Sequence, residues 1–335
     1  MEKSFDNFLK LEITNSIVPY SNSWLKIVLL IPMSLRTPVP SLQKGDLIYI
    51  TAPAKSIDAS YVHYAENYLL DQGYRVEIAK HCLGEFHYFS GSEAQRAIDF
   101  NHAIHNPEVK AILCARGGYG CIQILDQIDW DALSENPKWV VGFSDVTVFH
   151  HRLQHLGIPS IHGSMPLNFE ENSKEALNTL MHAVSGNPYS IHAPTHPSNR
   201  IGEVDGIIVG GNLSIVYSLL GTKDKTRFDG AILFIEDLAE QRYHLDRMLH
   251  SLVKSDATQG LKGLIVGSFT SMKDTDVPYG KDIEDIILEH FGGLNIPIAF
   301  GFPAGHIPDN RSIVFGEMAR FSVNDSGAKL SFRNN

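Results

Sequence analysis

The stretch VKAILCARGGYGCIQILDQIDWDALSENPKWVVGFSDVTVFHHRLQHLGIPSIH, residues 109–162, decides the fold. Short apolar runs in it alternate with segments of helical spacing. The expected strands are Val109–Ala115, Trp139–Phe143 and Pro159–His162, and the expected helices are Gly120–Ile128 and Asp145–Leu156. This β-α alternation predicts a parallel sheet with right-handed crossovers and helices on both faces.

The same alternation begins earlier in the chain. Its expected elements are the strands Asp46–Ala52 and Tyr74–Ala79 and the helices Tyr61–Gln72 and Ser92–His105. Ser92 is a plausible N-cap, because its hydroxyl can accept a hydrogen bond from the first turn of the helix. Residues 40–165 are therefore expected to form one α/β domain.

The pattern changes after residue 165. Residues 166–200 are rich in Asn, Ser, Pro and His, which is typical of a linker. From residue 201 to residue 335 the helices are fewer and the strands shorter, so a smaller, mixed and β-rich domain is expected. Its expected elements are the strands Ala231–Ile235, Leu261–Gly267, Ile296–Phe300, Ser312–Phe315 and Ala328–Phe332, and the helices Tyr243–Val253 and Asp282–His290.

Charge and composition exclude several classes of partner. The net charge is −10 and Lys and Arg form no basic cluster, which argues against nucleic acid. No apolar run reaches the roughly 18 residues that span a bilayer, so no membrane partner is expected. Cys82, Cys114 and Cys121 are too few for a disulfide framework and form no CxxC pair. They are expected to be buried thiols in a reducing compartment.

Residues 1–39 are interpreted as an N-terminal extension without clear periodicity. The apolar run Ile27–Met33 follows Lys26 as in a signal peptide, but Pro32 interrupts it and no clean cleavage site follows. A secretory signal is therefore not favoured. Met33 stands just before the regular pattern begins, which suggests the hypothesis that it is the natural start.

Ligands of open parallel sheets bind beyond the carboxyl ends of the strands, so the residues there are the first candidates. Arg116 and a glycine-rich turn that includes Gly118 follow one predicted strand. This loop would supply backbone donors to an oxyanion or carboxylate, or it is only a tight strand-to-helix turn. Gln123 stands where a dinucleotide fingerprint needs its last glycine, so that fingerprint is absent.

Ser144 follows the next predicted strand, within GFSDV. A serine on an abrupt strand-to-helix turn has an exposed hydroxyl, as in a nucleophile elbow. The second glycine of GxSxG is missing, however, and Ser144 or Asp145 would serve equally well as the N-cap of the following helix. From these residues alone the N-cap interpretation is preferred.

Two other strand ends carry ionisable residues. Glu236 and Asp237 end an apolar strand, where a carboxylate would orient a histidine, cap the next helix or pair with Arg242. His306 lies in a Pro/Gly loop, FPAGH, which favours function, although most histidines are surface or core groups. No HExxH motif and no cluster with ligand spacing is present, so no metal site is expected.

The motifs occur in one order along the chain: KGDLIYITAPA, FSGSEAQRAIDF, ARGGYG, GFSDVT, GGNLSIVYSLLGT, ILFIEDL, YHLDRML, LIVGSF and FGFPAGH. In this order and spacing they resemble the serine LD-carboxypeptidases, also called muramoyltetrapeptide carboxypeptidases, and their relatives that confer self-immunity to microcin C. The similarity runs from about Lys44 to Phe332.

The resemblance implies a flavodoxin-like N-terminal domain and a smaller β-rich C-terminal domain, with the active site in the cleft between them. Matched by motif, Ser144 is the nucleophile, Glu236 the orienting acid and His306 the general base of a triad that needs no cofactor. We expect the backbone N–H groups of Gly118 and Asp145 to form the oxyanion hole. Two residues, Arg116 and Asn212, are candidates for contacts to the substrate, although Asn212 would equally well only stabilise its own turn.

The implied reaction is the release of terminal D-alanine from murein tetrapeptide during peptidoglycan recycling in the cytoplasm, by a homodimer. One alternative is an immunity-type peptidase that hydrolyses an aminoacyl- or peptidyl-nucleotide amide. Such a site needs an aromatic platform for the nucleobase, and residues 174–200 contain no Trp and a single Tyr, Tyr189. The other is a non-catalytic binding protein on the same scaffold, against which the presence of all three triad residues argues.

Overall fold

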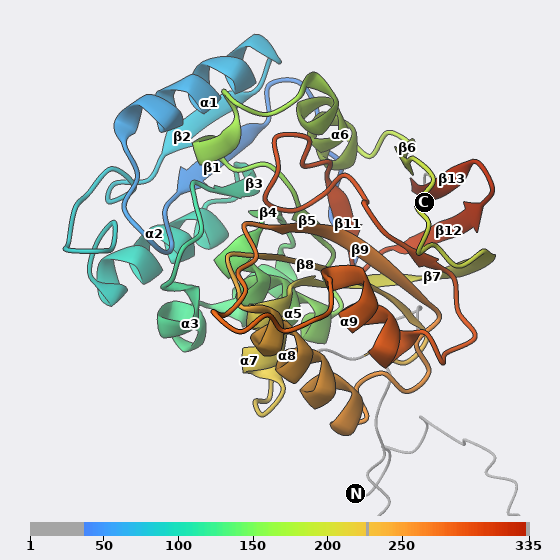
Figure 1. Cartoon of the computed structure of the whole chain (residues 1–335). Coiled ribbons are helices and arrows are strands. Elements are labelled where there is room, and N and C mark those ends of the chain that lie inside the picture. The colour runs from blue at the N-terminus through green and yellow to red at the C-terminus, as the bar shows by residue number, and fades with distance from the viewer. Residues whose placement is uncertain (1–36, 226–227, 333–335) are drawn as a thin grey trace, which may run out of the picture.

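The computed structural model describes residues 37–225 and 228–332 of the 335-residue chain. The apolar run at Ile27–Met33 and the suggested start at Met33 lie outside the described residues. Two sheet-containing units lie side by side, one coloured blue to green and the other mainly yellow to red (Figure 1). This arrangement confirms the expected α/β architecture.

The first sheet has six strands in the order β11-β5-β4-β3-β1-β2, and all neighbouring pairs except β11–β5 are parallel. The order 2-1-3-4-5 is that of a flavodoxin-like fold, as expected. The strands are β1 Leu47–Thr51, β2 Arg75–Ile78, β3 Val109–Cys114, β4 Trp139–Gly142, β5 Ser160–His162 and β11 Ile313–Phe315. The helices are α1 Ala59–Asp71, α2 Glu93–His105, α3 Cys121–Ile124, α4 Trp130–Glu135 and α5 Thr147–Leu156.

Local sequence explains how these elements begin and end. All five residues of β1 are buried, as the near-continuous apolar run predicts for a central parallel strand. Ser92 forms a capping box at the start of α2: its Oγ accepts from Gln95 N (3.3 Å), and Gln95 Oε1 accepts from Ser92 N (2.9 Å). Gly157 ends α5 in the left-handed conformation (φ 70°), which glycine adopts without steric cost.

The second sheet has seven strands in the order β10-β9-β8-β7-β12-β13-β6, parallel from β10 to β7 and antiparallel from β7 to β6. It is therefore mixed, as expected. Its strands are β6 Tyr189–Ala193, β7 Gly202–Asn212, β8 Ala231–Leu238, β9 Gly263–Thr270, β10 Ile298–Ala299, β12 Met318–Asn324 and β13 Gly327–Phe332. The remaining helices are α6 Lys174–Val184, α7 Leu213–Leu219, α8 Arg242–Lys254 and α9 Ile283–Phe291.

Residues 166–200 and strand β11 differ from the expected division of the chain into domains. The segment 166–200, expected to be a linker, contains α6 and the edge strand β6. Leu177, Leu180 and Val184 give α6 an apolar face that is buried. Strand β11, from the C-terminal part of the chain, joins the first sheet by pairing antiparallel with β5. The two sheets are therefore connected by more than one passage of the chain.

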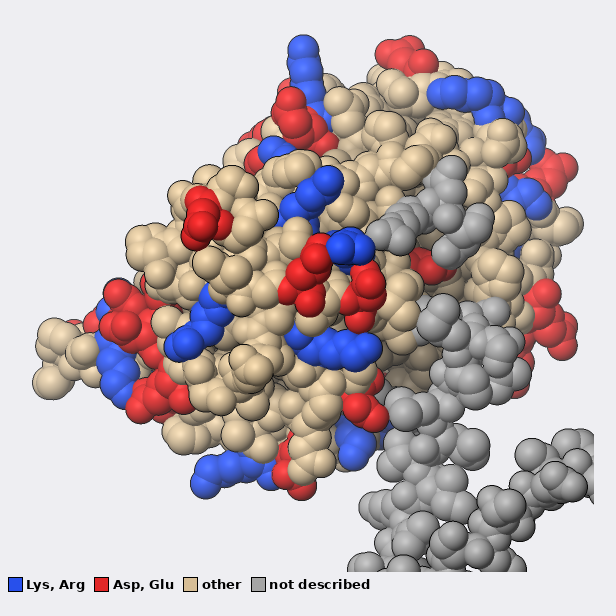
Figure 2. Space-filling model, turned by 90° about the vertical axis from the view of Figure 1, so that its right-hand side faces the viewer, with Lys and Arg blue, Asp and Glu red and all other residues tan. Residues whose placement is uncertain are grey.

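The surface and the thiols agree with the sequence analysis. Lys, Arg, Asp and Glu side chains are interspersed on the face that Figure 2 presents. Cys82, Cys114 and Cys121 are buried and free. Burial, together with the charge of Asp99, raises the pKa of the Cys82 thiol to about 12. Among the described residues, no helix is long and apolar enough to cross a membrane.

Candidate active site

Ser144 lies on a sharp corner between β4 and α5. Its φ is +62°, in the left-handed region, whereas Phe143 before it is extended. A left-handed conformation costs a residue with a side chain about 1–2 kcal/mol, and such strain is concentrated at functional sites. Neither the short turn Ser144–Val146 nor α5 has a side-chain cap, so the N-cap interpretation is wrong. The corner has the form of a nucleophile elbow.

The glycine-rich loop after β3 packs directly on this corner. A Cβ on Gly117 would lie 2.9 Å from Ser144 Cβ and 3.2 Å from Asp145 N, so only glycine fits without displacing the elbow. The buried Asp145 carboxylate accepts hydrogen bonds from the backbone N–H groups of Cys121 (2.8 Å) and Gly120. Burial raises the pKa of Asp145 despite these bonds. The loop and the elbow therefore pack together and are joined by hydrogen bonds.

We expect Gly117→Ala to lower kcat by at least about 10²-fold, because a displacement of about 1 Å at a reacting group has that effect. Gly221→Ala is the matched control, since a Cβ at Gly221 would contact no atom within 4 Å. Steady-state kinetics of peptide cleavage measure the effect, and melting curves of both variants show whether the fold is intact. If Gly117→Ala retained full kcat, the loop would not support the elbow.

Arg96 of α2 holds the other side of the glycine-rich loop, a role that the sequence analysis missed. It is 1% exposed. Its Nη1 donates to Pro53 O (2.6 Å) and Gly120 O (2.9 Å), its Nε to Gly91 O (3.1 Å) and its Nη2 to Gln123 Oε1 (2.7 Å). One feature of the sequence could have indicated this role: Arg96 lies on the apolar face of a predicted helix. A guanidinium buried there must find acceptors for its N–H groups, and backbone carbonyls of a nearby loop can supply them.

Glu236 and His306 form a direct pair. Glu236 lies on β8 and is fully buried, and His306 Nδ1 donates to its Oε2 at 2.6 Å. The register between β8 and β9 shifts at Glu236, an irregularity of the kind that redirects a side chain next to an active site. Gly305 has φ +110°, and a Cβ there would lie 2.9 Å from Glu236 Oε2, so the glycine of FPAGH lets the loop approach the carboxylate.

The surroundings of His306 suit a general base. Burial lowers its pKa, but the charge of Glu236, the hydrogen bond between them and the charge of Asp237 outweigh burial, so the pKa is raised. Since Nδ1 is bound to Glu236, Nε2 is the nitrogen left for proton transfer. The ring of Phe143 meets the His306 ring edge to face, with centroids 4.9 Å apart. The residue before Ser144 therefore contacts the histidine, which brings the elbow beside the pair.

Asn212 is engaged within the fold. It is the N-cap of α7, where Oδ1 accepts from Ile215 N (3.3 Å), and Nδ2 donates to Asp237 Oδ1 (3.0 Å). Its backbone N–H donates to Thr147 Oγ1 on α5 (3.1 Å), a hydrogen bond that connects the two sheet units. These bonds favour the turn-stabilising role over a contact to substrate.

Arg116 and Gly118 lie on the same loop. Arg116 Nη1 donates to Ser56 O at 2.9 Å, and its Nε is buried without a partner among the described residues. Gly118 is exposed with φ +108°, and a Cβ there would lie 3.0 Å from both Lys55 Cβ and the Tyr88 hydroxyl. The half-buried Lys55 and the exposed Tyr88 and Tyr119 thus lie beside Gly118. We name these three residues the Tyr88 rim, which was not predicted from the sequence.

The Tyr88 rim is aromatic and cationic. Lys55 Nζ lies 4.9 Å from the centre of the Tyr88 ring, within cation–π range. Tyr88 is 43% exposed and Tyr119 is 50% exposed. A planar or sugar-like part of a ligand would find a stacking surface there.

Comparison with known proteins identifies the family of the chain. Family models described as the LD-carboxypeptidase N-terminal and C-terminal domains match residues 48–163 and 205–321. A candidate carboxypeptidase of Synechocystis is 33% identical over 90% of this chain and 99% of its own length. The murein tetrapeptide carboxypeptidase of Pseudomonas aeruginosa is 29% identical over 81% of this chain and 92% of its own length.

Solved structures show the same fold. Muramoyltetrapeptide carboxypeptidase from Oxalobacter formigenes superposes with a TM-score of 0.78 at 28% identity, over 85% of this chain and 98% of that one. The microcin C7 self-immunity protein MccF superposes with a TM-score of 0.78 at 20% identity, over 88% and 98%, a likeness in fold alone. On these matches and the two-sheet architecture, the chain belongs to the LD-carboxypeptidase family of peptidases.

Proposed function

We propose that this protein is a serine-type LD-carboxypeptidase that releases terminal D-alanine from murein tetrapeptide, with Ser144, His306 and Glu236 as its triad. One arrangement carries the proposal. Ser144 has the left-handed backbone conformation on a strand-to-helix corner, and its neighbour Phe143 contacts His306, which is hydrogen-bonded to the buried Glu236. The names of the relatives from Pseudomonas and Oxalobacter support this substrate class.

The proposed reaction is acyl transfer to serine. His306 Nε2 takes the proton of the Ser144 hydroxyl as Oγ attacks the scissile carbonyl carbon. The tetrahedral intermediate collapses when His306 gives that proton to the nitrogen of the leaving D-alanine, so the C–N bond breaks and an acyl ester forms. Water, deprotonated by His306, then attacks the ester. His306 returns that proton to Ser144 Oγ as the C–Oγ bond breaks, which releases the tripeptide carboxylate and restores the serine.

Glu236 and two backbone donors complete the mechanism. The carboxylate holds the His306 tautomer with its proton on Nδ1 and stabilises the imidazolium that forms. We assign the oxyanion hole to the N–H groups of Asp145 and Gly118, each worth about 3 kcal/mol of transition-state stabilisation. The contact between Gly117 and both residues of the elbow supports this choice of loop.

We assign Arg116 to the free carboxylate that a carboxypeptidase must recognise. A guanidinium binds a carboxylate through two parallel hydrogen bonds, and Arg116 Nε has no partner among the described residues. On the family resemblance alone, we also propose that the protein is a homodimer that acts in the cytoplasm, in peptidoglycan recycling.

The direct test is mass spectrometry of a purified muropeptide tetrapeptide incubated with the protein in the presence of EDTA. Loss of one alanine that EDTA does not affect is expected, since the proposed triad uses no metal. An intact tetrapeptide would contradict the proposed substrate and turn attention to amides of aminoacyl nucleotides.

The Tyr88 rim gives this second candidate function, an immunity-type peptidase, a specific observation in its favour. Exposed tyrosines beside Gly118 offer the aromatic platform that a nucleobase needs, in a loop other than residues 174–200. Tyr119→Ala separates the two functions. It should raise KM for a nucleotide amide and leave KM for an unmodified tetrapeptide unchanged if the rim binds bases.

The raised pKa of His306 predicts the pH dependence of activity. A protonated imidazole cannot accept the serine proton, so kcat/KM falls as the pH drops through the His306 pKa. Because that pKa lies above the ordinary 6.5, the acidic limb is expected above pH 6.5. A pH profile of kcat/KM, with circular dichroism showing the fold intact at each pH, measures it. A limb centred below pH 6.5 would contradict the proposed pairing with Glu236.

A further inference from the structure

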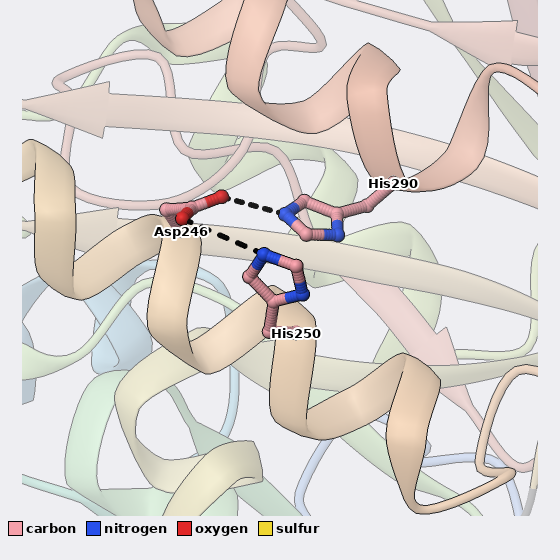
Figure 3. A group of neighbouring side chains, drawn as sticks. All are labelled: Asp246, His250 and His290. Atoms are coloured by element: carbon pink, nitrogen blue, oxygen red, sulfur yellow. Dashed lines mark hydrogen bonds and ion pairs between the residues drawn. The ribbon is translucent and has the colours of Figure 1, made fainter.

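Three side chains with metal-binding atoms converge between two helices of the C-terminal unit. Asp246 and His250 are one turn apart on α8, and His290 reaches them from α9 (Figure 3). One potential ligand atom from each lies within 4.8 Å of the others. The sequence did not predict this group, because its third member lies on a separate helix.

The separations resemble those of a tetrahedral zinc site. With bonds of about 2.0–2.2 Å, two ligand atoms of such a site lie roughly 3.4 Å apart. Here His290 Nε2 lies 2.7 Å from Asp246 Oδ1, and His250 Nε2 lies 3.7 Å from the other carboxylate oxygen, Oδ2. Both nitrogens are therefore near the carboxylate, and a shift of one imidazole would bring one ligand atom from each residue to the required separation. The His250 side chain is 55% exposed, so it can rotate to improve the geometry without disturbing the core.

The group also has the outer support that metal ligands usually have. The Tyr279 hydroxyl forms a hydrogen bond with the Asp246 carboxylate, which orients it as a second-shell partner orients a ligand. The His290 side chain is only 5% exposed, and its ring packs edge to face on His250, with centroids 4.4 Å apart. Two imidazoles and one carboxylate are a ligand set suited to zinc.

We propose that Asp246, His250 and His290 bind one divalent transition-metal ion of the zinc class, with water as the fourth ligand. The ion connects α8 to α9. None of the three residues belongs to the proposed triad, so the ion serves the structure of this unit, and hydrolysis does not require it. The simpler alternative is that the three side chains form only hydrogen bonds and ion pairs with one another.

Calorimetric titration of the EDTA-treated full chain with Zn²⁺ separates the two cases. One saturable equivalent is expected for the unmodified protein. His250→Ala, which removes an exposed ligand, should weaken binding at least about tenfold. His192→Ala is the matched control, since His192 is an exposed histidine on β6 outside the group. Co²⁺ should give the intense visible absorption of a tetrahedral ion only where His250 is present.

The melting temperature gives a second readout. A ligand that binds only the folded state raises it, so Zn²⁺ should raise the melting temperature of the unmodified protein and of His192→Ala equally, and that of His250→Ala by less. Absence of saturable binding, or equal affinity in His250→Ala, would overturn the proposal. Neither result bears on the triad, which peptide cleavage in EDTA tests separately.

Discussion

Ser144→Ala is expected to lower kcat by at least about 10⁴-fold, because removing the nucleophile of a triad leaves only binding and oxyanion stabilisation. The fold should not change: alanine keeps the Cβ that meets Gly117 and bears the same cost at φ +62°. Alanine release from the tetrapeptide, followed by mass spectrometry, measures the loss.

A serine of ordinary geometry provides the control for that experiment. Ser134→Ala, on α4 and outside the elbow, should retain full activity. A serine-directed acylating reagent should add its mass to the unmodified protein and to Ser134→Ala, but not to Ser144→Ala. Turnover by Ser144→Ala close to that of the unmodified protein would remove Ser144 from the mechanism, and with it the serine-type assignment.

Glu236→Gln is the second large effect that we expect, a fall in kcat of about 10³- to 10⁴-fold. The neutral amide no longer stabilises the imidazolium, and its NH₂ group can face Nδ1 and so favour the wrong tautomer. Removing the negative charge also lowers the His306 pKa, so the acidic limb of residual activity should move to lower pH. The pH profile of the variant therefore tests a role that loss of activity alone would not identify.

The matched control for this change is Glu135→Gln, an exposed glutamate at the end of α4. It removes the same charge from the surface and should leave both kcat and the pH profile unchanged. If Glu236→Gln kept the acidic limb in place, the charge of Glu236 would not act on His306, and the hydrogen bond between them would be only structural.

The sequence alone predicted features that depend on short-range pattern. The alternation over residues 109–162 predicted the parallel sheet, because buried strands and amphipathic helices have different apolar periods. Ser92 predicted the start of α2, because an N-cap involves neighbouring residues only. The order of the motifs predicted the family, which the comparisons confirm.

Helix α6 and the pairing of strand β11 were not predicted. Helix α6 has apolar residues at helical spacing, Leu177, Leu180 and Val184, but the Asn, Ser, Pro and His residues that follow it made the whole segment look like a linker. Strand β11 has only three residues, and no local feature shows that it pairs with β5 rather than with the sheet of its neighbours. Both elements gain their stability from partners distant in the chain.

Motif order predicted Ser144, Glu236 and His306 as the site residues, but only the tertiary structure decided what surrounds them. Glu236 and His306 are 70 residues apart, and Arg96 reaches Gly120 across 24 residues. The left-handed turn of Ser144, the clearance at Gly117 and the meeting of His290 with Asp246 depend equally on such contacts. Contacts over these separations leave no periodicity in the sequence, because they arise from how whole elements pack against one another.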